Sequence, residues 1–95
     1  MTTKIREVYQ KLLEKFPMQY KESWDNAGFL VGDMEKEATG VLVALDITEP
    51  VISDCVEKGW NLIVSHHPVI FRPQGKITTE TPTGTHVMRL IQHGI

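Results

Sequence analysis

Two adjacent histidines, His66 and His67, are the residues of this 95-residue sequence best suited to chemistry. They follow the apolar run 62–64 and stand in the segment Ser65-His66-His67-Pro68. Neutral imidazole is a common ligand of zinc, iron, nickel and copper. Because adjacent side chains diverge at a strand end, the pair can serve two neighbouring metal ions rather than chelate one. Alternatively, His66 is a partly buried, hydrogen-bonded histidine and His67 lies in the following loop.

Asp46 is the second candidate, because it follows another apolar run, residues 41–45. If both runs are parallel strands, their carboxyl ends lie at one edge of the sheet, about 4.8 Å apart. Open α/β sheets bind ligands at that edge. Asp46 could then hydrogen-bond a ligating histidine, orient a water, contact substrate or ligate a metal directly. It could also cap the following helix, although Thr48 is better placed to do so.

The segment Trp24-Asp25-Asn26 places a carboxylate and an amide before Gly28. We expect Asp25 and Asn26 to contact a substrate, although Asx side chains also stabilise turns without any ligand. Cys55 lies on the apolar stripe of an expected helix and is interpreted as a core residue. His86 and His93, on the last expected helix, are not interpreted as ligands. The sequence has no phosphate-binding glycine loop, no paired-cysteine zinc motif and no nucleophile elbow.

The elements that would position these residues follow from the spacing of apolar side chains. Apolar residues recur between residues 5 and 16 at helical spacing, with Thr3 as the expected cap and Pro17 as the stop. Residues 29–31 are expected to form a short strand. Residues 41–46 and 60–65 are expected to be strands buried on both faces, because apolar and β-branched residues follow one another without alternation.

A helix between Thr48 and Gly59 would connect these two strands, which makes a βαβ unit. Residues 71–82 are expected to form a loop, and residues 85–93 a last helix capped by Gly94. The predicted fold is therefore an α/β fold, a βαβ-containing sheet with flanking helices. Because Ile95 stands where another strand is due, residues 1–95 are expected to be one domain, an incomplete N-terminal part of a larger fold.

Composition limits the class of protein. Hydrophobic residues make up 41% and charged residues 23% of the chain, and the net charge is −2. These values are ordinary for a globular domain and do not favour a nucleic-acid binder. The single cysteine excludes an internal disulfide and fits a reducing compartment. No run is long enough to span a membrane and the first residues are not signal-like, so we expect a cytoplasmic protein.

Three segments resemble the NIF-three-like family, whose members carry the name GTP cyclohydrolase one type two homologue. They are residues 23–32 (SWDNAGFLVG), 44–48 (ALDIT) and 61–71 (NLIVSHHPVIF), in this order. The resemblance continues to the last helix. It implies an α/β fold, a homohexameric ring and a dinuclear divalent-metal site in each subunit. The two ions would be zinc, iron, manganese or nickel.

In that family the two adjacent histidines ligate the metals, and here they correspond to His66 and His67. The family's other ligands are an aspartate placed shortly after the region matched here and a His/Glu pair near its C-terminus. No residue of this chain corresponds to them, so they are not assigned to His86 or His93. The family name implies hydrolytic opening of the purine ring of GTP.

Three functional hypotheses follow. In the first, the chain is the N-terminal part of a metal-dependent hydrolase acting on a small molecule, with Asp46 orienting a ligand or a water. In the second, it belongs to a metal-binding regulatory or assembly module without catalysis. In the third, the 95-residue chain has no activity of its own and self-associates through exposed apolar surface.

Overall fold

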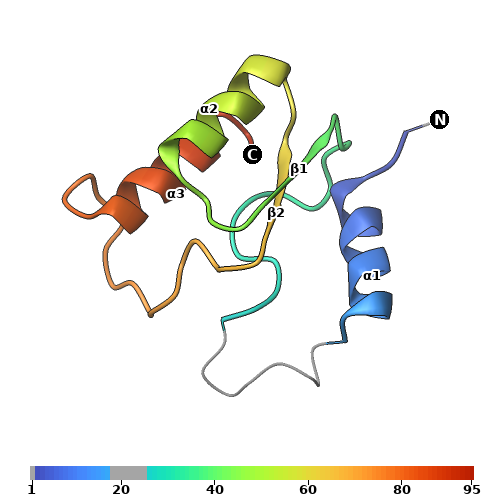
Figure 1. The fold of residues 1–95 in the computed structure, drawn as a ribbon, viewed down its shortest axis with the longest axis horizontal. Coiled ribbons are helices and arrows are strands. Elements are labelled where there is room, and N and C mark those ends of the chain that lie inside the picture. Colours follow the sequence, from blue (N-terminus) through green and yellow to red (C-terminus); the bar gives the residue numbers. More distant parts are fainter. Residues whose placement is uncertain (1, 18–25) are drawn as a thin grey trace.

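The computed structural model describes residues 2–17 and 26–95, which form three helices and a two-stranded parallel sheet. The order along the chain is α1 (Ile5–Lys15), β1 (Val41–Ala44), α2 (Glu49–Lys58), β2 (Leu62–Ser65) and α3 (Pro82–Gln92). Helices α2 and α3 lie together on one side of the sheet, and α1 lies apart from them (Figure 1). None of the helices in the described ranges is long and apolar enough to cross a membrane.

The parallel βαβ unit is confirmed. β1 pairs with β2 from Val41 opposite Leu62 to Ala44 opposite Ser65. Helix α2 connects the strands, and Thr48 caps it as predicted because its hydroxyl accepts from the Val51 N–H at 3.4 Å. Gly59 ends the helix in the left-handed conformation, with φ 71°. The segment between β2 and α3 contains neither helix nor strand, also as predicted.

The core lies between α2, α3 and one face of the sheet. Ile52 and Cys55 of α2 are fully buried and pack with Leu90 and Ile95. The partly buried residues around them include Leu42 of β1 and Ile63 of β2. Cys55 is 0% exposed, so its assignment to the core is confirmed, and this burial raises the pKa of its thiol.

The prediction that both strands are buried on both faces is wrong for β1. Its side chains alternate, with Leu42 and Ala44 half-buried and Val41 and Val43 exposed, and Val43 is 78% exposed. Only the face toward α2 and α3 is covered along β1. In β2 all four residues are half-buried, and they line a common cavity with residues of α1 and of the segment 26–33.

Three local predictions also require correction. Residues 29–31 form no strand, because Phe29 packs against Tyr9 and Val31 packs on the core instead of pairing through the backbone. Thr3 does not cap α1, because the helix has Lys4 as its N-cap residue, and the Lys4 N–H donates to the Glu7 carboxylate at 3.2 Å. The Thr3 carbonyl instead accepts from the Ala38 N–H at 2.7 Å, beside an antiparallel bridge of Lys4 with Glu37. Helix α3 begins at Pro82, because the Thr81 hydroxyl accepts from the Gly84 N–H at 3.0 Å.

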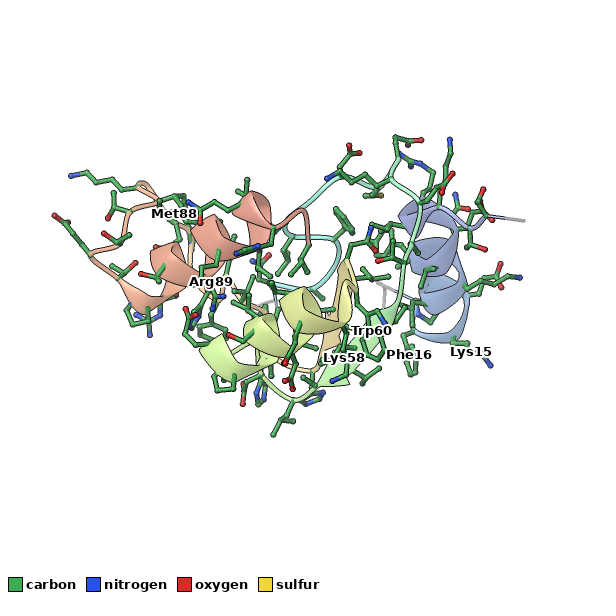
Figure 2. All side chains as sticks on the ribbon, turned by 90° about the horizontal axis from the view of Figure 1, so that it is seen from above. Lys15, Phe16, Lys58, Trp60, Met88 and Arg89 are labelled. Atoms are coloured by element: carbon green, nitrogen blue, oxygen red, sulfur yellow. The ribbon has the colours of Figure 1, made fainter. Side chains whose placement is uncertain are left out.

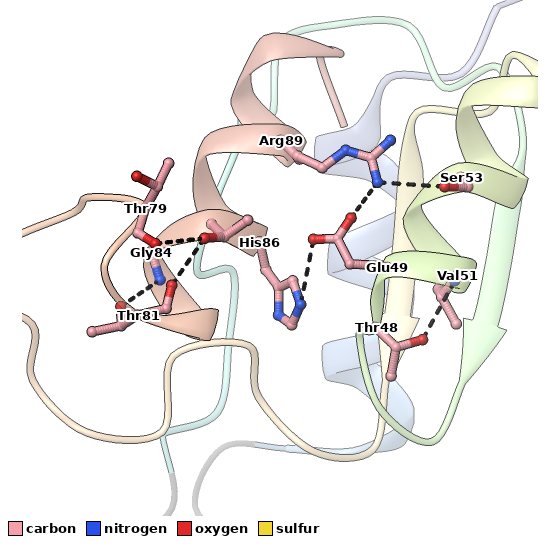
Figure 3. A network of polar contacts seen from close by, with 10 residues as sticks. Thr48, Glu49, Val51, Ser53, Thr79, Thr81, Gly84, His86 and Arg89 are labelled. Atoms are coloured by element: carbon pink, nitrogen blue, oxygen red, sulfur yellow. Dashed lines mark hydrogen bonds and ion pairs between the residues drawn. The ribbon is translucent and has the colours of Figure 1, made fainter.

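Polar and cation–aromatic contacts support the elements of the fold. Glu49 accepts a hydrogen bond from Arg89 and lies 3.5 Å from the His86 ring, which links α2 to α3 (Figure 3). The Lys58 ammonium lies 5.4 Å from the centre of the Trp60 ring just before β2 (Figure 2). Near α1, the Arg6 guanidinium donates to Glu35 and lowers the pKa of that carboxyl.

The burial pattern predicts unequal responses on the two faces of the βαβ unit. Ile52→Ala should lower the free energy of unfolding by about 2–5 kcal/mol, because it leaves a cavity in the core. Val43→Thr, at an exposed position that keeps a β-branched side chain, should change it by less than about 0.5 kcal/mol. Urea unfolding followed by circular dichroism measures both. Equal losses would contradict the assignment of the core to the α2 face.

The left-handed end of α2 predicts a second matched pair. Gly59→Ala should cost about 1 kcal/mol, because alanine disfavours φ 71° although no atom lies near the added Cβ. Gly75→Ala also meets no atom within 4 Å, and Gly75 has no left-handed backbone, so this variant should be no less stable than the parent. The same urea measurement compares them, and a Gly59 variant as stable as the Gly75 variant would refute the conformational explanation.

Candidate metal site

The backbone of His66 and His67 is fixed by the end of β1. The His66 N–H donates to the Ala44 carbonyl at 3.1 Å, and the His67 N–H donates to the Leu45 carbonyl at 3.0 Å. These bonds continue the parallel pairing beyond the last residues of the two strands. The strand ends therefore place both histidines and Asp46 at one edge of the sheet, as the sequence predicted.

Asp46 and His67 form a direct contact. The Nδ1 atom of His67 lies 2.7 Å from Oδ1 of Asp46, and the two side chains are 56% and 54% exposed. An ionised carboxylate only accepts hydrogen bonds, so Nδ1 of His67 must carry the proton. In the neutral ring the lone pair then lies on Nε2, where a metal ion can bind. At this exposure the contact orients the ring more than it stabilises the fold.

His66 and His67 lie side by side. Their ring centres are 4.9 Å apart, and the ring planes are inclined by 56°. Both rings are exposed and line a cavity of about 920 Å³ between α1 and β2. Most of the other residues that line this cavity are apolar. They come mainly from α1, from residues 26–33, from β2 and the residues after it, and from the end of the chain.

Two histidines alone are fewer donors than a zinc site in a protein ordinarily uses. In residues 2–17 and 26–95, no three His, Cys, Asp or Glu residues come together in a way that could hold a metal ion. A catalytic zinc ion ordinarily takes three protein ligands, and a structural one takes four. The donor chemistry of the histidines, with a carboxylate behind one ring, fits a divalent metal. Any further ligands would have to lie outside the described residues.

Asn26 is brought to the same cavity, where its side-chain amide donates to the carbonyl of Ile70 in the loop after β2. This bond ties the segment before Gly28 to the segment that follows the histidines. Asp25 lies outside the described residues. The predicted substrate contacts of Asp25 and Asn26 stay predictions.

The other two histidines lie away from this edge. His86 faces Glu49 between α2 and α3 (Figure 3). His93 is the C-terminal cap residue of α3. Neither residue lines the cavity that His66 and His67 share.

The chain matches the family model Duf34/NIF3 (NGG1p interacting factor 3) over residues 3–95, and it belongs to that family. It is 41% identical over 92 residues to the GTP cyclohydrolase 1 type 2 homolog of Clostridium perfringens. It is 44% identical over 92 residues to a protein of the same name from Staphylococcus aureus. Each match covers 97% of this chain, but 35% and 25% of the relatives. The chain thus spans about a quarter to a third of their length.

Solved structures of this family have the same fold. A crystal structure of a Staphylococcus aureus protein is 43% identical and has a TM-score of 0.92, over 98% of this chain and 30% of that protein. The structure of a Bacillus cereus protein related to NIF3 is 30% identical and has a TM-score of 0.91, over 99% of this chain and 26% of that protein. The predicted α/β fold and the predicted family are confirmed.

The Asp46–His67 contact predicts a tautomer that can be measured. At about pH 8, above the ordinary pKa of histidine, His67 should carry its proton mainly on Nδ1. Asp46→Ala removes the acceptor and should shift the proton mainly to Nε2, which ¹⁵N chemical shifts of the ring detect. His93 is the internal control and should not change. An unchanged His67 spectrum in the variant would show that Asp46 does not set the tautomer.

Proposed function

We propose that this chain supplies two imidazole ligands, His66 and His67, to a divalent-metal site of a hydrolase. The observation that carries the proposal is the 2.7 Å contact between Asp46 and Nδ1 of His67. Ligating histidines usually give their second ring N–H to a carboxylate or carbonyl, which fixes the ring and leaves the other nitrogen for the metal. The curated relatives, named GTP cyclohydrolase 1 type 2 homolog, support a hydrolytic reaction on a purine nucleotide.

Each side chain has a separate part in this proposal. His66 and His67 hold one ion each, on rings whose centres lie 4.9 Å apart. Asp46 orients the His67 ring. Asn26 and Asp25 offer an amide and a carboxylate to a small-molecule substrate. Bound zinc, iron, manganese or nickel would polarise the bond to be cleaved and lower the pKa of a water.

A metal-binding assembly module without catalysis is the second candidate. Val41, Val43 and Leu45 form an exposed apolar strip along β1, and Val43 and Leu45 are 78% and 63% exposed. Contiguous apolar surface of this kind favours association with other polypeptide. The homohexameric ring implied by the family resemblance is one such assembly.

Metal titration tests the proposed ligands. His66→Ala combined with His67→Ala should abolish binding of Zn²⁺ or Co²⁺ in calorimetry, because both imidazoles are lost. Asp46→Ala should weaken binding by about 10–100-fold, because the carboxylate only orients a ligand. His93→Ala is the matched control and should bind as the parent does. Loss of binding in the control, or no loss in the double variant, would refute the site.

Sedimentation and turnover distinguish the two candidate functions. The apolar strip predicts that Val43→Lys reduces self-association in sedimentation velocity, because it places a charge among Val41 and Leu45. Ile91→Lys is the matched control, since Ile91 is 61% exposed on α3, away from the strip. Metal-dependent turnover of GTP that the double histidine variant lacks would favour the hydrolase. Metal binding and self-association without turnover would favour the assembly module.

A further inference from the structure

We propose that Ser65 is a positioning residue for the imidazole of His67. Ser65 is the last residue of β2, and its hydroxyl donates to the carbonyl of His67 at 2.7 Å. The consequence of this contact for metal affinity rests on the proposed function.

His67 is held by hydrogen bonds at three points. Its N–H donates to the Leu45 carbonyl, its Nδ1 contacts Asp46, and its carbonyl accepts from Ser65. The first two bonds connect His67 to the residues that follow β1. The third connects it to Ser65, two residues earlier, and closes the turn after β2. Because all three act on one residue, loosening the turn lets the ring move relative to the Asp46 carboxylate.

Pro68 explains why the His67 carbonyl needs this support. Proline has no N–H, so the peptide between His67 and Pro68 carries an acceptor but no donor. Proline also biases His67 toward extended backbone, while the chain must leave the sheet at this point. The serine hydroxyl spans the two residues and stabilises the turn.

Ser65 is also the polar exception in its strand. The three residues before it, Leu62, Ile63 and Val64, are apolar, and Ser65 lies opposite Ala44 in the register. A small apolar residue would suit the same place in the sheet but could not donate to the carbonyl. Metal sites require their ligands within about 0.5 Å and 10–20° of the working geometry, so a small displacement of the ring is enough to weaken binding.

An isosteric pair of variants tests the proposal. Ser65→Thr keeps a hydroxyl. Ser65→Val places a side chain of nearly the same shape as threonine at this position, but without the hydroxyl. In the metal-free protein at about pH 8, the threonine variant should keep the parent distribution of the His67 proton between Nδ1 and Nε2. The valine variant and Ser65→Ala should lower the Nδ1-protonated fraction. Titration with Co²⁺ should then give parent-like affinity for threonine and about 10-fold weaker binding for valine and alanine.

A separate control removes a hydroxyl elsewhere. Ser53→Ala removes a hydroxyl of α2 that accepts from Arg89 at 3.4 Å, and it should alter neither the His67 ring signals nor Co²⁺ affinity. If the valine and threonine variants differ only in urea stability, with identical His67 signals, Ser65 is merely structural and the proposal is wrong. If their His67 signals differ as expected but the parent binds no Co²⁺, the positioning role stands and the proposed metal function fails.

Discussion

The parallel pairing of β1 with β2 is the constraint on which the candidate site depends. In a parallel pair both strands end at the same edge, so residues separated by twenty positions emerge beside one another. The pairing continues past the strands into the backbone N–H groups of His66 and His67. The contact between Asp46 and His67 requires this arrangement, because an antiparallel pair would place the two strand ends at opposite edges. Helix α2 makes the parallel pairing possible by returning the chain to the starting edge.

The two faces of the sheet have different roles. Helices α2 and α3 cover one face, where Ile52, Cys55 and Leu90 form the core that holds the strands in place. On the other side α1 faces β2 across a cavity, and β1 exposes its apolar strip. The curated relatives are about three to four times as long as this chain.

The candidate site combines backbone and side-chain restraint. The backbone bonds to Ala44 and Leu45 place the histidines, whereas Asp46 and Ser65 orient one of them. In the proposed site, the Nε2 atom of His67 would therefore have a defined direction toward a metal ion.

The sequence by itself determined the local elements and their order. Helical spacing, the Thr48 cap and Gly59 were enough to predict α1, α2 and the βαβ unit, because these signals act within a few residues. The place of Asp46 and His67 at one edge followed from that order. Only the tertiary structure decided that β1 is covered on one face, that residues 29–31 do not pair and that Lys4 pairs with Glu37. It also decided that Ser65 bonds the His67 carbonyl. Most of these features depend on tertiary contacts between segments that are distant in sequence, and the type and spacing of residues do not specify such contacts.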